Sequence, residues 1–184
     1  MQIVNLVDHQ ELAEQAAVLL VVGFRQHYPQ AWLDRASGLE EVREFSQPDR
    51  ICRLAVADDG QVLGWVGGIR EYNGRAWELH PLVVHPNFQG QGIGRALVAD
   101  LEAQVGACGG VTIFLGTDDE DDQTSLSGVD LYPNLLEQIA AIQNISRHPY
   151  EFYQKVGFTI VGVIPDANGL GKPDIIMAKR VVNN

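Results

Sequence analysis

Three glycines at alternate positions mark the passage from an apolar strand into an amphipathic helix. They are Gly90, Gly92 and Gly94, and they follow an apolar strand end at residues 82–84. The helix after them carries apolar residues at helical spacing, namely Ile93, Leu97, Leu101 and Val105. Glycine lets a backbone come close to a ligand, and the free N–H groups at a helix N-terminus attract phosphate. The sequence therefore predicts a turn that binds a phosphorylated cofactor.

Two better-known phosphate-binding motifs do not fit this turn. Either start of the dinucleotide pattern G-x-G-x-x-G would need a third glycine where Arg95 or Leu97 stands. A P-loop needs Gly-Lys-Ser/Thr, whereas residues 171–173 are Gly-Lys-Pro. The pattern that remains is Q-x-x-G-x-G, which begins at Gln89.

Length and composition predict a single domain over residues 1–184. The chain has 184 residues, 46% of them hydrophobic, and a formal charge of 13 − 24 = −11, which is enough apolar content for a core. The negative charge disfavours nucleic acid and anionic membranes and favours a cationic small molecule. There is no apolar stretch of the roughly 20 residues that a membrane span needs, and no secretion signal. We therefore expect a cytoplasmic protein whose Cys52 and Cys108 are free thiols.

Hydrophobic periodicity and turn signals predict a chain of strands and helices. An Asp-Asp-Gly turn at residues 58–60 favours a β-hairpin, and Gly23 is expected to end the first helix. The aromatic segment 27–32 either caps the core or lines a ligand cleft. The expected strands cover residues 2–7, 51–58, 61–70, 75–84 and 111–116, and the expected helices cover residues 11–23 and 39–45.

The glycine turn resembles the pyrophosphate-binding turn of the GNAT superfamily, whose members transfer an acetyl group from acetyl-CoA to amines. Residues 149–158 resemble the late helix and strand of that superfamily, with Tyr153 at the position of its usual tyrosine. The resemblance narrows to bacterial aminoglycoside 6'-N-acetyltransferases in segments 77–84, 115–119, 148–153 and 167–174. It implies an α/β (mixed α+β) fold with a mixed, largely antiparallel sheet flanked by helices. It also implies acetyl-CoA as co-substrate, no metal, and a homodimer.

The same resemblance assigns the cofactor contacts. The backbone amide of Leu82 would stabilise the oxyanion of the reaction, and residues 82–84 would pair with the pantetheine arm as another strand would. The pyrophosphate would lie on the glycine turn. The predicted cofactor-binding residues are Leu82, Val83, Val84, Gln89, Gly90, Gln91, Gly92, Ile93 and Gly94.

Acetyl transfer to an amine needs a base for the ammonium proton and an acid for the departing thiolate. Glu78 is the predicted base, directly or through water; it could instead orient a cationic acceptor or be an exposed strand carboxylate. Tyr153 is the predicted acid, and the alternative is a helix tyrosine with its hydroxyl at the surface. His80, two residues after Glu78, is expected on the same face of the strand. It would assist the base, line the acceptor cleft or be structural.

Residues 118–122 are Asp-Asp-Glu-Asp-Asp. This block is either a solvated loop or a rim that steers and holds a polycation, and a calcium loop fits poorly because Gln123 stands where an EF-hand needs glycine. Asp118 and Asp119 are the predicted substrate contacts within it. By the resemblance, Tyr72 is a further candidate for contact with the substrate.

These observations predict direct acetyl transfer, in a ternary complex, from acetyl-CoA to the 6'-amine of an aminoglycoside. Neither cysteine has the environment of an acyl-enzyme nucleophile. Two alternatives stay open. The first is an acetyltransferase for another amine, such as a polyamine or a protein, and the second is a non-catalytic module that binds acyl-CoA.

Overall fold

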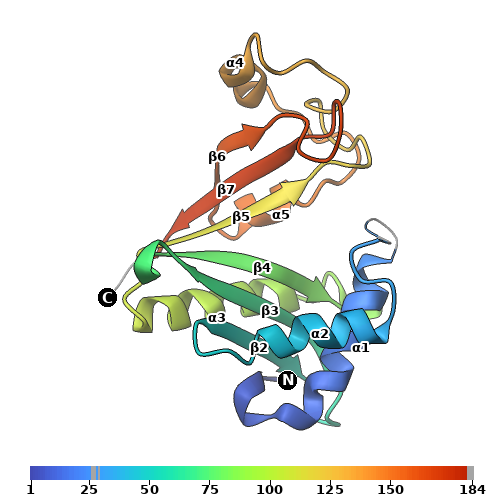
Figure 1. Cartoon of the computed structure of the whole chain (residues 1–184), viewed down its shortest axis with the longest axis vertical. Helices are drawn as coiled ribbons and strands as arrows, with labels where there is room; N and C mark the ends of the chain where they lie inside the picture. Colours follow the sequence, from blue (N-terminus) through green and yellow to red (C-terminus); the bar gives the residue numbers. More distant parts are fainter. Residues whose placement is uncertain (26–27, 29, 182–184) are drawn as a thin grey trace. The chain divides into compact units, whose positions relative to one another are not determined.

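The computed structural model describes residues 1–25, 28 and 30–181, and the chain divides into two compact units (Figure 1). Unit 1 comprises Met1–Ile113 and Val181–Asn184, and unit 2 comprises Phe114–Arg180. The expectation of a single N-acetyltransferase domain over residues 1–184 concerns how the units act together, and it stays a prediction. The predicted α/β class is confirmed, since both units combine strands and helices.

Unit 1 is built on four antiparallel strands in the order β1-β2-β3-β4. The predicted hairpin is confirmed, with Val56 opposite Val62 across the turn. The first strand is shorter than expected, because the chain enters a 3-10 turn at Leu6 in which the Asn5 side chain accepts the Val7 amide at 3.4 Å. The strands are β1 (Gln2–Asn5), β2 (Arg50–Val56), β3 (Val62–Glu71) and β4 (Ala76–Val84).

The α-helices in the described part of unit 1 are α1 (Ala13–Phe24), α2 (Arg35–Glu44) and α3 (Ile93–Ala107). The apolar stripe predicted for α3 is confirmed, since its four residues are all buried. Gly23, however, does not end α1, which continues to Phe24. A Cβ at Gly23 would collide with the side chain of Val83. Glycine therefore stands there because it lets α1 approach β4 closely.

The core between the sheet and helices α1 and α2 is centred on Trp65. This side chain is fully buried, and its indole N–H donates to the carbonyl of Ala16 in α1 at 3.2 Å. The Phe45 ring meets Trp65 edge to face at a centroid distance of 5.4 Å. Because both large aromatic groups are buried and the indole proton has an acceptor, they fix α1 and the segment after α2 on this face of the sheet.

Strand β4 carries a β-bulge opposite Gly67. The register with β3 shifts between Val66 and Gly68, so that β4 contains an extra residue at His80–Pro81. A Cβ on Gly67 would overlap both the His80 carbonyl and the Phe45 ring. The bulge thus needs a residue without a side chain at this place in β3.

Unit 2 contains three strands in the order β5-β7-β6, with β6 and β7 antiparallel. Figure 1 shows β5 and β7 running in opposite directions. The strand expected at 111–116 runs two residues further, so Asp118 ends β5 rather than opening the loop. The elements are β5 (Thr112–Asp118), α4 (Leu135–Ala140), α5 (Tyr150–Lys155), β6 (Thr159–Ile164) and β7 (Asp174–Arg180). In the part of the chain that the structure describes, no helix is long and apolar enough to cross a membrane.

A buried histidine holds unit 2 together at the end of β5. His148 is 1% exposed, and its Nε2 donates to the carbonyl of Asp118 at 3.0 Å while its Nδ1 accepts the Tyr150 amide at 3.2 Å. Its backbone amide donates to the Asn144 side chain at 2.8 Å. The two ring contacts need a neutral imidazole with its proton on Nε2. Burial lowers the pKa of His148, which favours this neutral form.

We predict that the protein loses stability as the pH falls below about 6.5, the ordinary pKa of histidine. Because the pKa of His148 is lower in the folded state, the unfolded state binds more protons in this range and unfolding becomes easier. The contribution is complete above that pH and is lost as the pH falls towards the folded-state pKa. Urea unfolding between pH 8 and pH 5 should show a shallower pH dependence for His148→Gln than for the parent. His9→Gln, at a half-exposed histidine, should keep the parental slope, and equal slopes for all three proteins would contradict the prediction.

We also predict that Gly67→Ala destabilises the protein by about 2 kcal/mol, because the new methyl group overpacks the bulge. Gly162→Ala in β6 is the matched control, since a Cβ there meets nothing within 4 Å. Chemical unfolding of both variants measures the difference. Equal free energies of unfolding for the two variants would show that the bulge tolerates a side chain at this position.

Candidate active site

The backbone amides of β4 point alternately towards β3 and away from it. The amide of His85 donates to the Leu63 carbonyl of β3 at 2.8 Å. Because such hydrogen-bonded pairs alternate along an antiparallel ladder, the amide of Val83 also points to β3, whereas those of Leu82 and Val84 point away. Unit 1 therefore presents two of the three amides that were predicted to contact the cofactor.

The bulge is the reason that Leu82 faces outward. The amide of Arg70 donates to the carbonyl of Asp49, the residue before β2, at 3.1 Å. The preceding residue, Ile69, therefore faces β4 and pairs through hydrogen bonds with Glu78. Regular alternation from Glu78 would turn the Leu82 amide towards β3. The extra residue of the bulge reverses the alternation, so the Leu82 N–H points away from β3.

The glycine turn is open and is braced by its own glutamine. Gly90 and Gly92 have φ angles of 76° and 85°, and a Cβ on either would meet nothing within 4 Å. Their conformation, rather than crowding, thus requires glycine. The Gln89 side chain donates to the Val84 carbonyl at 3.2 Å. Gly92 is the N-cap of the 15-residue helix α3 and supplies no capping side chain, so the first-turn amides of α3 suit a pyrophosphate.

The remaining residues predicted around the turn differ in how they can take part. Gln91 is exposed beside the glycines, and Gly94 lies in the first turn of α3. The side chain of Ile93 is buried in the core, so only its backbone is available to a cofactor. The backbone groups of the glycine turn and of the first turn of α3 thus fit the phosphates of coenzyme A.

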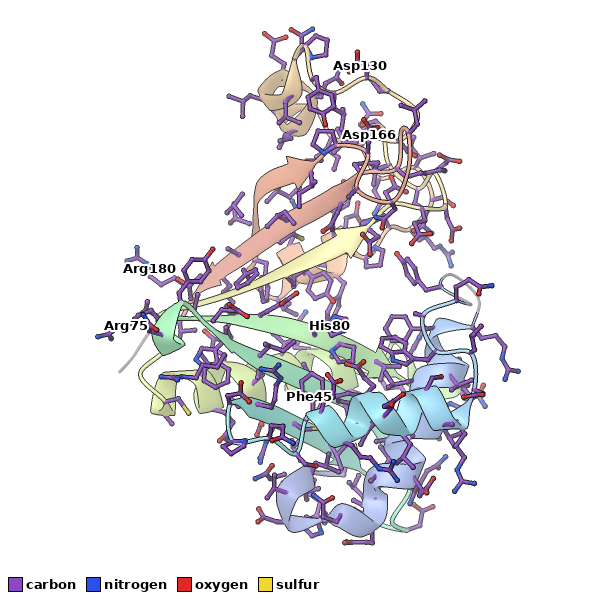
Figure 2. The ribbon with its side chains drawn as sticks, viewed as in Figure 1. Phe45, Arg75, His80, Asp130, Asp166 and Arg180 are labelled. Carbon is purple, nitrogen blue, oxygen red and sulfur yellow. The ribbon has the colours of Figure 1, made fainter. Side chains whose placement is uncertain are left out.

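Glu78 and His80 lie on the face of β4 that is covered by α1 and α2. Glu78 stands opposite Ile69, which packs against the core of that face, and its side chain is half-buried. His80 lies 3.8 Å from Glu41 of α2, measured between Nε2 and Oε1, and Figure 2 shows it between β4 and that helix. The expectation that His80 shares the face of Glu78 is met.

Trp32 and Glu41 also lie at this face, and neither was predicted from the sequence as a site residue. The Trp32 indole N–H donates to Glu41 Oε2 at 3.4 Å, and the Trp32 and His80 rings lie 6.2 Å apart. Trp32 also contacts the Phe24 ring at 4.8 Å. The aromatic segment that was expected to cap the core or line a cleft does pack partly on the core through Trp32. Residues 27 and 29 of this segment lie outside the described residues.

Tyr72 is strongly exposed, at 75%, in the short turn η3 (Tyr72–Gly74) that precedes β4. Its backbone has a positive φ of 46°. Among the described residues of unit 1, no hydrogen bond or ring contact to the Tyr72 side chain is found. A substrate contact by Tyr72 stays a prediction.

Unit 2 carries the other predicted site residues. Tyr153 is half-buried on α5, with its ring against Phe152 and Phe158 at centroid distances of 5.2 and 5.7 Å. Burial raises the pKa of the Tyr153 phenol, so the group keeps its proton at neutral pH. Asp118 receives a hydrogen bond from the Asn168 side chain at 2.5 Å. Its own carbonyl is held by His148.

Asp119 differs from the expectation that it meets the substrate. Its side chain is 0% exposed, and its two oxygens accept the backbone amides of Gln123 at 2.6 Å and Thr124 at 2.8 Å. A carboxylate that satisfies two loop amides in this way has no exposed face for a ligand. Asp119 therefore shapes the acidic loop from inside.

Asp122 at the other end of the acidic block is also engaged. Its carboxylate pairs with the Lys172 ammonium at 2.6 Å and accepts the Ser127 hydroxyl at 2.5 Å. These two partners hold the pKa of Asp122 below its usual range. Part of the charge of the block is thus neutralised by the chain itself.

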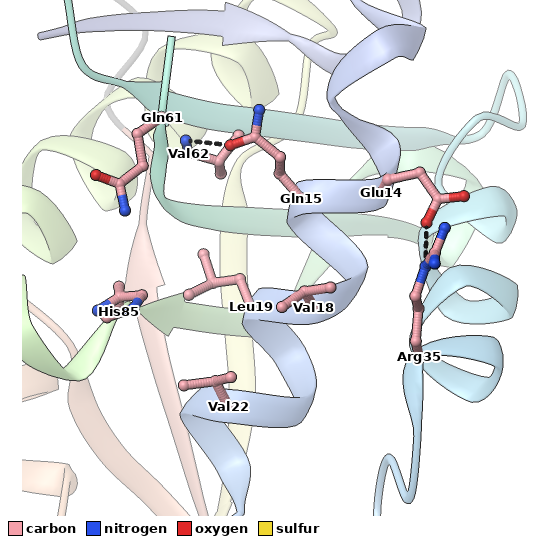
Figure 3. Close-up of a pocket in the computed structure, with 9 residues that line it drawn as sticks. All are labelled: Glu14, Gln15, Val18, Leu19, Val22, Arg35, Gln61, Val62 and His85. Carbon is pink, nitrogen blue, oxygen red and sulfur yellow. Dashed lines mark hydrogen bonds and ion pairs between the residues drawn. The ribbon is translucent and has the colours of Figure 1, made fainter. Parts of the chain in front are cut away.

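A cavity of about 380 Å³ lies on unit 1 along α1 (Figure 3). Its floor is apolar, with Val18, Leu19 and Val22 of α1, and the Glu14–Arg35 ion pair of 2.6 Å stands at its rim. None of the predicted catalytic residues lines it. Among the described residues there is also no group of three or more His, Cys, Asp or Glu side chains that could hold a metal ion.

Comparison with known proteins bears on these features directly. The sequence matches the acetyltransferase (GNAT) family over residues 17–132. Comparison with curated protein sequences gives no significant match. A ribosomal-protein-S18-alanine N-acetyltransferase from Escherichia coli is 17% identical with a TM-score of 0.63, covering 98% of this chain and 93% of that one, and it shares the fold.

Two solved structures are similar over their whole length. One is an aminoglycoside 6'-N-acetyltransferase complexed with coenzyme A, with 43% identity and a TM-score of 0.90. The other is an aminoglycoside 6'-N-acetyltransferase from Enterococcus faecium, with 43% identity and a TM-score of 0.89. Each comparison covers 100% of this chain and 99% of the other. With its open glycine turn and the outward amides of β4, the chain belongs to the GNAT family of acetyltransferases.

Proposed function

We propose that this chain acetylates the 6'-amine of an aminoglycoside, with acetyl-CoA as donor, by direct transfer in a ternary complex. The observation that carries the proposal is the full-length similarity, at 43% identity, to aminoglycoside 6'-N-acetyltransferases, one of them bound to coenzyme A. A net charge of −11 is consistent with a cationic acceptor and opposes nucleic acid and anionic membranes as partners.

The cofactor side of the proposal uses backbone groups of unit 1. When bound, acetyl-CoA supplies a thioester whose acyl carbon an amine can attack. The glycine turn and the N-terminus of α3 would hold the phosphates, and the amide of Val84 would pair with the pantetheine arm. The Leu82 amide, which the bulge turns outward, would donate to the acyl oxygen as negative charge develops there. A preorganised donor of this kind contributes a few kcal/mol to catalysis.

The proton transfers are assigned to side chains. Glu78 would accept the ammonium proton, directly or through water, from its half-buried place on β4. Tyr153, whose pKa is raised by burial, would be the donor that returns a proton to the thiolate. On the acceptor side we assign substrate contacts to His80, Asp118 and Tyr72. Asp119 would contribute through the shape of the loop that follows Asp118.

The proposal is tested by steady-state release of coenzyme A from acetyl-CoA with a 6'-amino aminoglycoside. We expect turnover, and mass spectrometry should find one acetyl group on the 6'-nitrogen. Turnover with a linear polyamine or a peptide amine alone would instead support an acetyltransferase for another amine. Tight binding of coenzyme A without transfer to any amine would identify a non-catalytic module.

The Glu78→Gln variant tests the mechanism within the same assay. We expect kcat to fall by about 100-fold, most strongly at low pH, because the ammonium proton then has no acceptor. Glu71→Gln is the matched control, since Glu71 is an exposed carboxylate at the end of β3. A pH–rate profile that is unchanged by Glu78→Gln would leave Glu78 as an orienting residue only.

We further propose that the chain forms a homodimer through unit 2. Apolar side chains stand exposed there, including Leu136 at 81%, Ile145 at 66%, Val161 at 62% and Leu170 at 94%. Within unit 2, β6 is the last strand of the order β5-β7-β6 and has one unpaired edge. Exposed apolar groups and an open strand edge each favour association with another chain.

Light scattering should give twice the 20.2 kDa mass of one chain. Replacing Leu170 with aspartate should shift the protein towards the monomer, because a charge would enter the apolar contact. Val7→Asp, at an exposed apolar residue of unit 1, is the control and should stay dimeric. A monomeric parent would refute the dimer.

We propose the cytoplasm as the location and antibiotic resistance as the role. Cys52 is buried and Cys108 is exposed, and both are free thiols, as a reducing compartment allows. Burial also raises the pKa of Cys52 far above its usual range, which leaves that thiol inert.

A further inference from the structure

We propose that Glu41 is a positioning residue for the acceptor side of the reaction and acts through His80. The proposal rests on the proposed function and deepens it. Glu41 lies on α2, outside every segment that carried the family resemblance. Its carboxylate contacts Trp32, in the segment before α2, and His80, on the face of β4 that carries Glu78.

One carboxylate bridges a loop, a helix and a strand at this place. Glu41 Oε2 accepts the Trp32 indole N–H at 3.4 Å, and Glu41 Oε1 lies 3.8 Å from His80 Nε2. The side chain of Glu41 is 22% exposed, whereas that of His80 is 46% exposed. Glu41 is thus more buried than His80, and the His80 side chain is accessible to a ligand.

Helix α2 fixes Glu41 in this place by its own packing. The helix begins with a capping box. The Asp34 side chain accepts the Ser37 amide at 2.9 Å, and the Asp34 amide donates to the Ser37 hydroxyl oxygen at 3.2 Å. Val42, the next residue, is fully buried, and Phe45 is 1% exposed. A residue between a capped start and two buried anchors has little freedom to move along β4.

The Glu41 carboxylate lies on the Nε2 side of the His80 ring. A carboxylate 3.8 Å from Nε2 favours the tautomer that carries its proton on that nitrogen. The lone pair on Nδ1 is then left to accept a hydrogen bond from an ammonium group, an amine or a water. The Trp32 ring lies 6.2 Å from the His80 ring, measured between centroids.

The experiment is a double-mutant cycle of Glu41→Gln with His80→Gln. Glutamine keeps the size of Glu41 and can still accept the indole proton, but it removes the charge that faces His80. We expect Glu41→Gln to lower kcat/KM for the amine by about tenfold, with the KM for acetyl-CoA unchanged. In the His80→Gln background the same change should have almost no further effect. Glu40→Gln, at an exposed residue of the same helix, should behave as the parent.

A purely structural role for Glu41 would give a different result. Glu41→Gln would then reduce activity equally in both backgrounds, or would raise the KM for acetyl-CoA, and either outcome would overturn the proposal. Full activity of Glu41→Gln would overturn it as well. Rescue by Glu41→Asp, to within about threefold of the parent, would support the charge as the active feature.

A second readout needs no substrate and separates this proposal from the proposed function. The chain has three tryptophans, and Trp32→Phe assigns the indole N–H signal of Trp32 in an NMR spectrum. Glu41→Gln should shift the Trp32 indole and His80 ring signals and leave those of Trp65 and Trp77 in place. If the parent acetylates no amine, the proposed function fails, and the positioning by Glu41 is then decided by these shifts. Unmoved Trp32 and His80 signals would refute it.

Discussion

The steric fit of a glycine against a strand bulge governs the chemistry that unit 1 can offer. The bulge at His80–Pro81 needs a residue without a side chain opposite it, and Gly67 meets that need under the Phe45 ring. By adding one residue to β4, the bulge turns the Leu82 amide away from β3 while Glu78 stays paired through its backbone to β3. In the proposed mechanism, the donor for the acyl oxygen and the carboxylate for the amine would thus come from two parts of one strand whose hydrogen-bonding alternation differs.

Unit 2 uses buried polar groups for a similar purpose. His148 holds the carbonyl of Asp118, and Asp119 holds two amides of the loop that follows. These hydrogen bonds order the loop in addition to the burial of its apolar side chains Leu126 and Leu131. The end of β5 is therefore fixed by groups whose protonation states matter. The hydrogen bonds of His148 need its neutral form.

The local pattern in the sequence predicts the parts of the fold that depend on neighbours in the chain. The hairpin at Asp-Asp-Gly, helix α3 and the glycine turn follow from turn chemistry and helical spacing, and the structure confirms them. The prediction that Gly23 ends the first helix was wrong, because glycine is needed there to avoid the side chain of Val83, which is 60 positions further along the chain. Glu41 was missed for the same cause. Its neighbours Trp32 and His80 come together only when α2 packs on β4, and periodicity marks it merely as a charged helix residue.

Part of the negative charge of the acidic block is not accessible to a cationic ligand. The block at residues 118–122 contains five acidic residues, yet Asp119 is buried in the loop and Asp122 is paired with Lys172. A count of carboxylates therefore overstates the field that this loop can offer to a cation. Glu41 of α2 and Glu78 are partly buried at one face of β4, and Trp32 and His80 lie next to Glu41. Partial burial weakens the screening of these charges by solvent. For the proposed function, these two carboxylates would therefore attract a cationic amine more effectively than the density of charge in the acidic block.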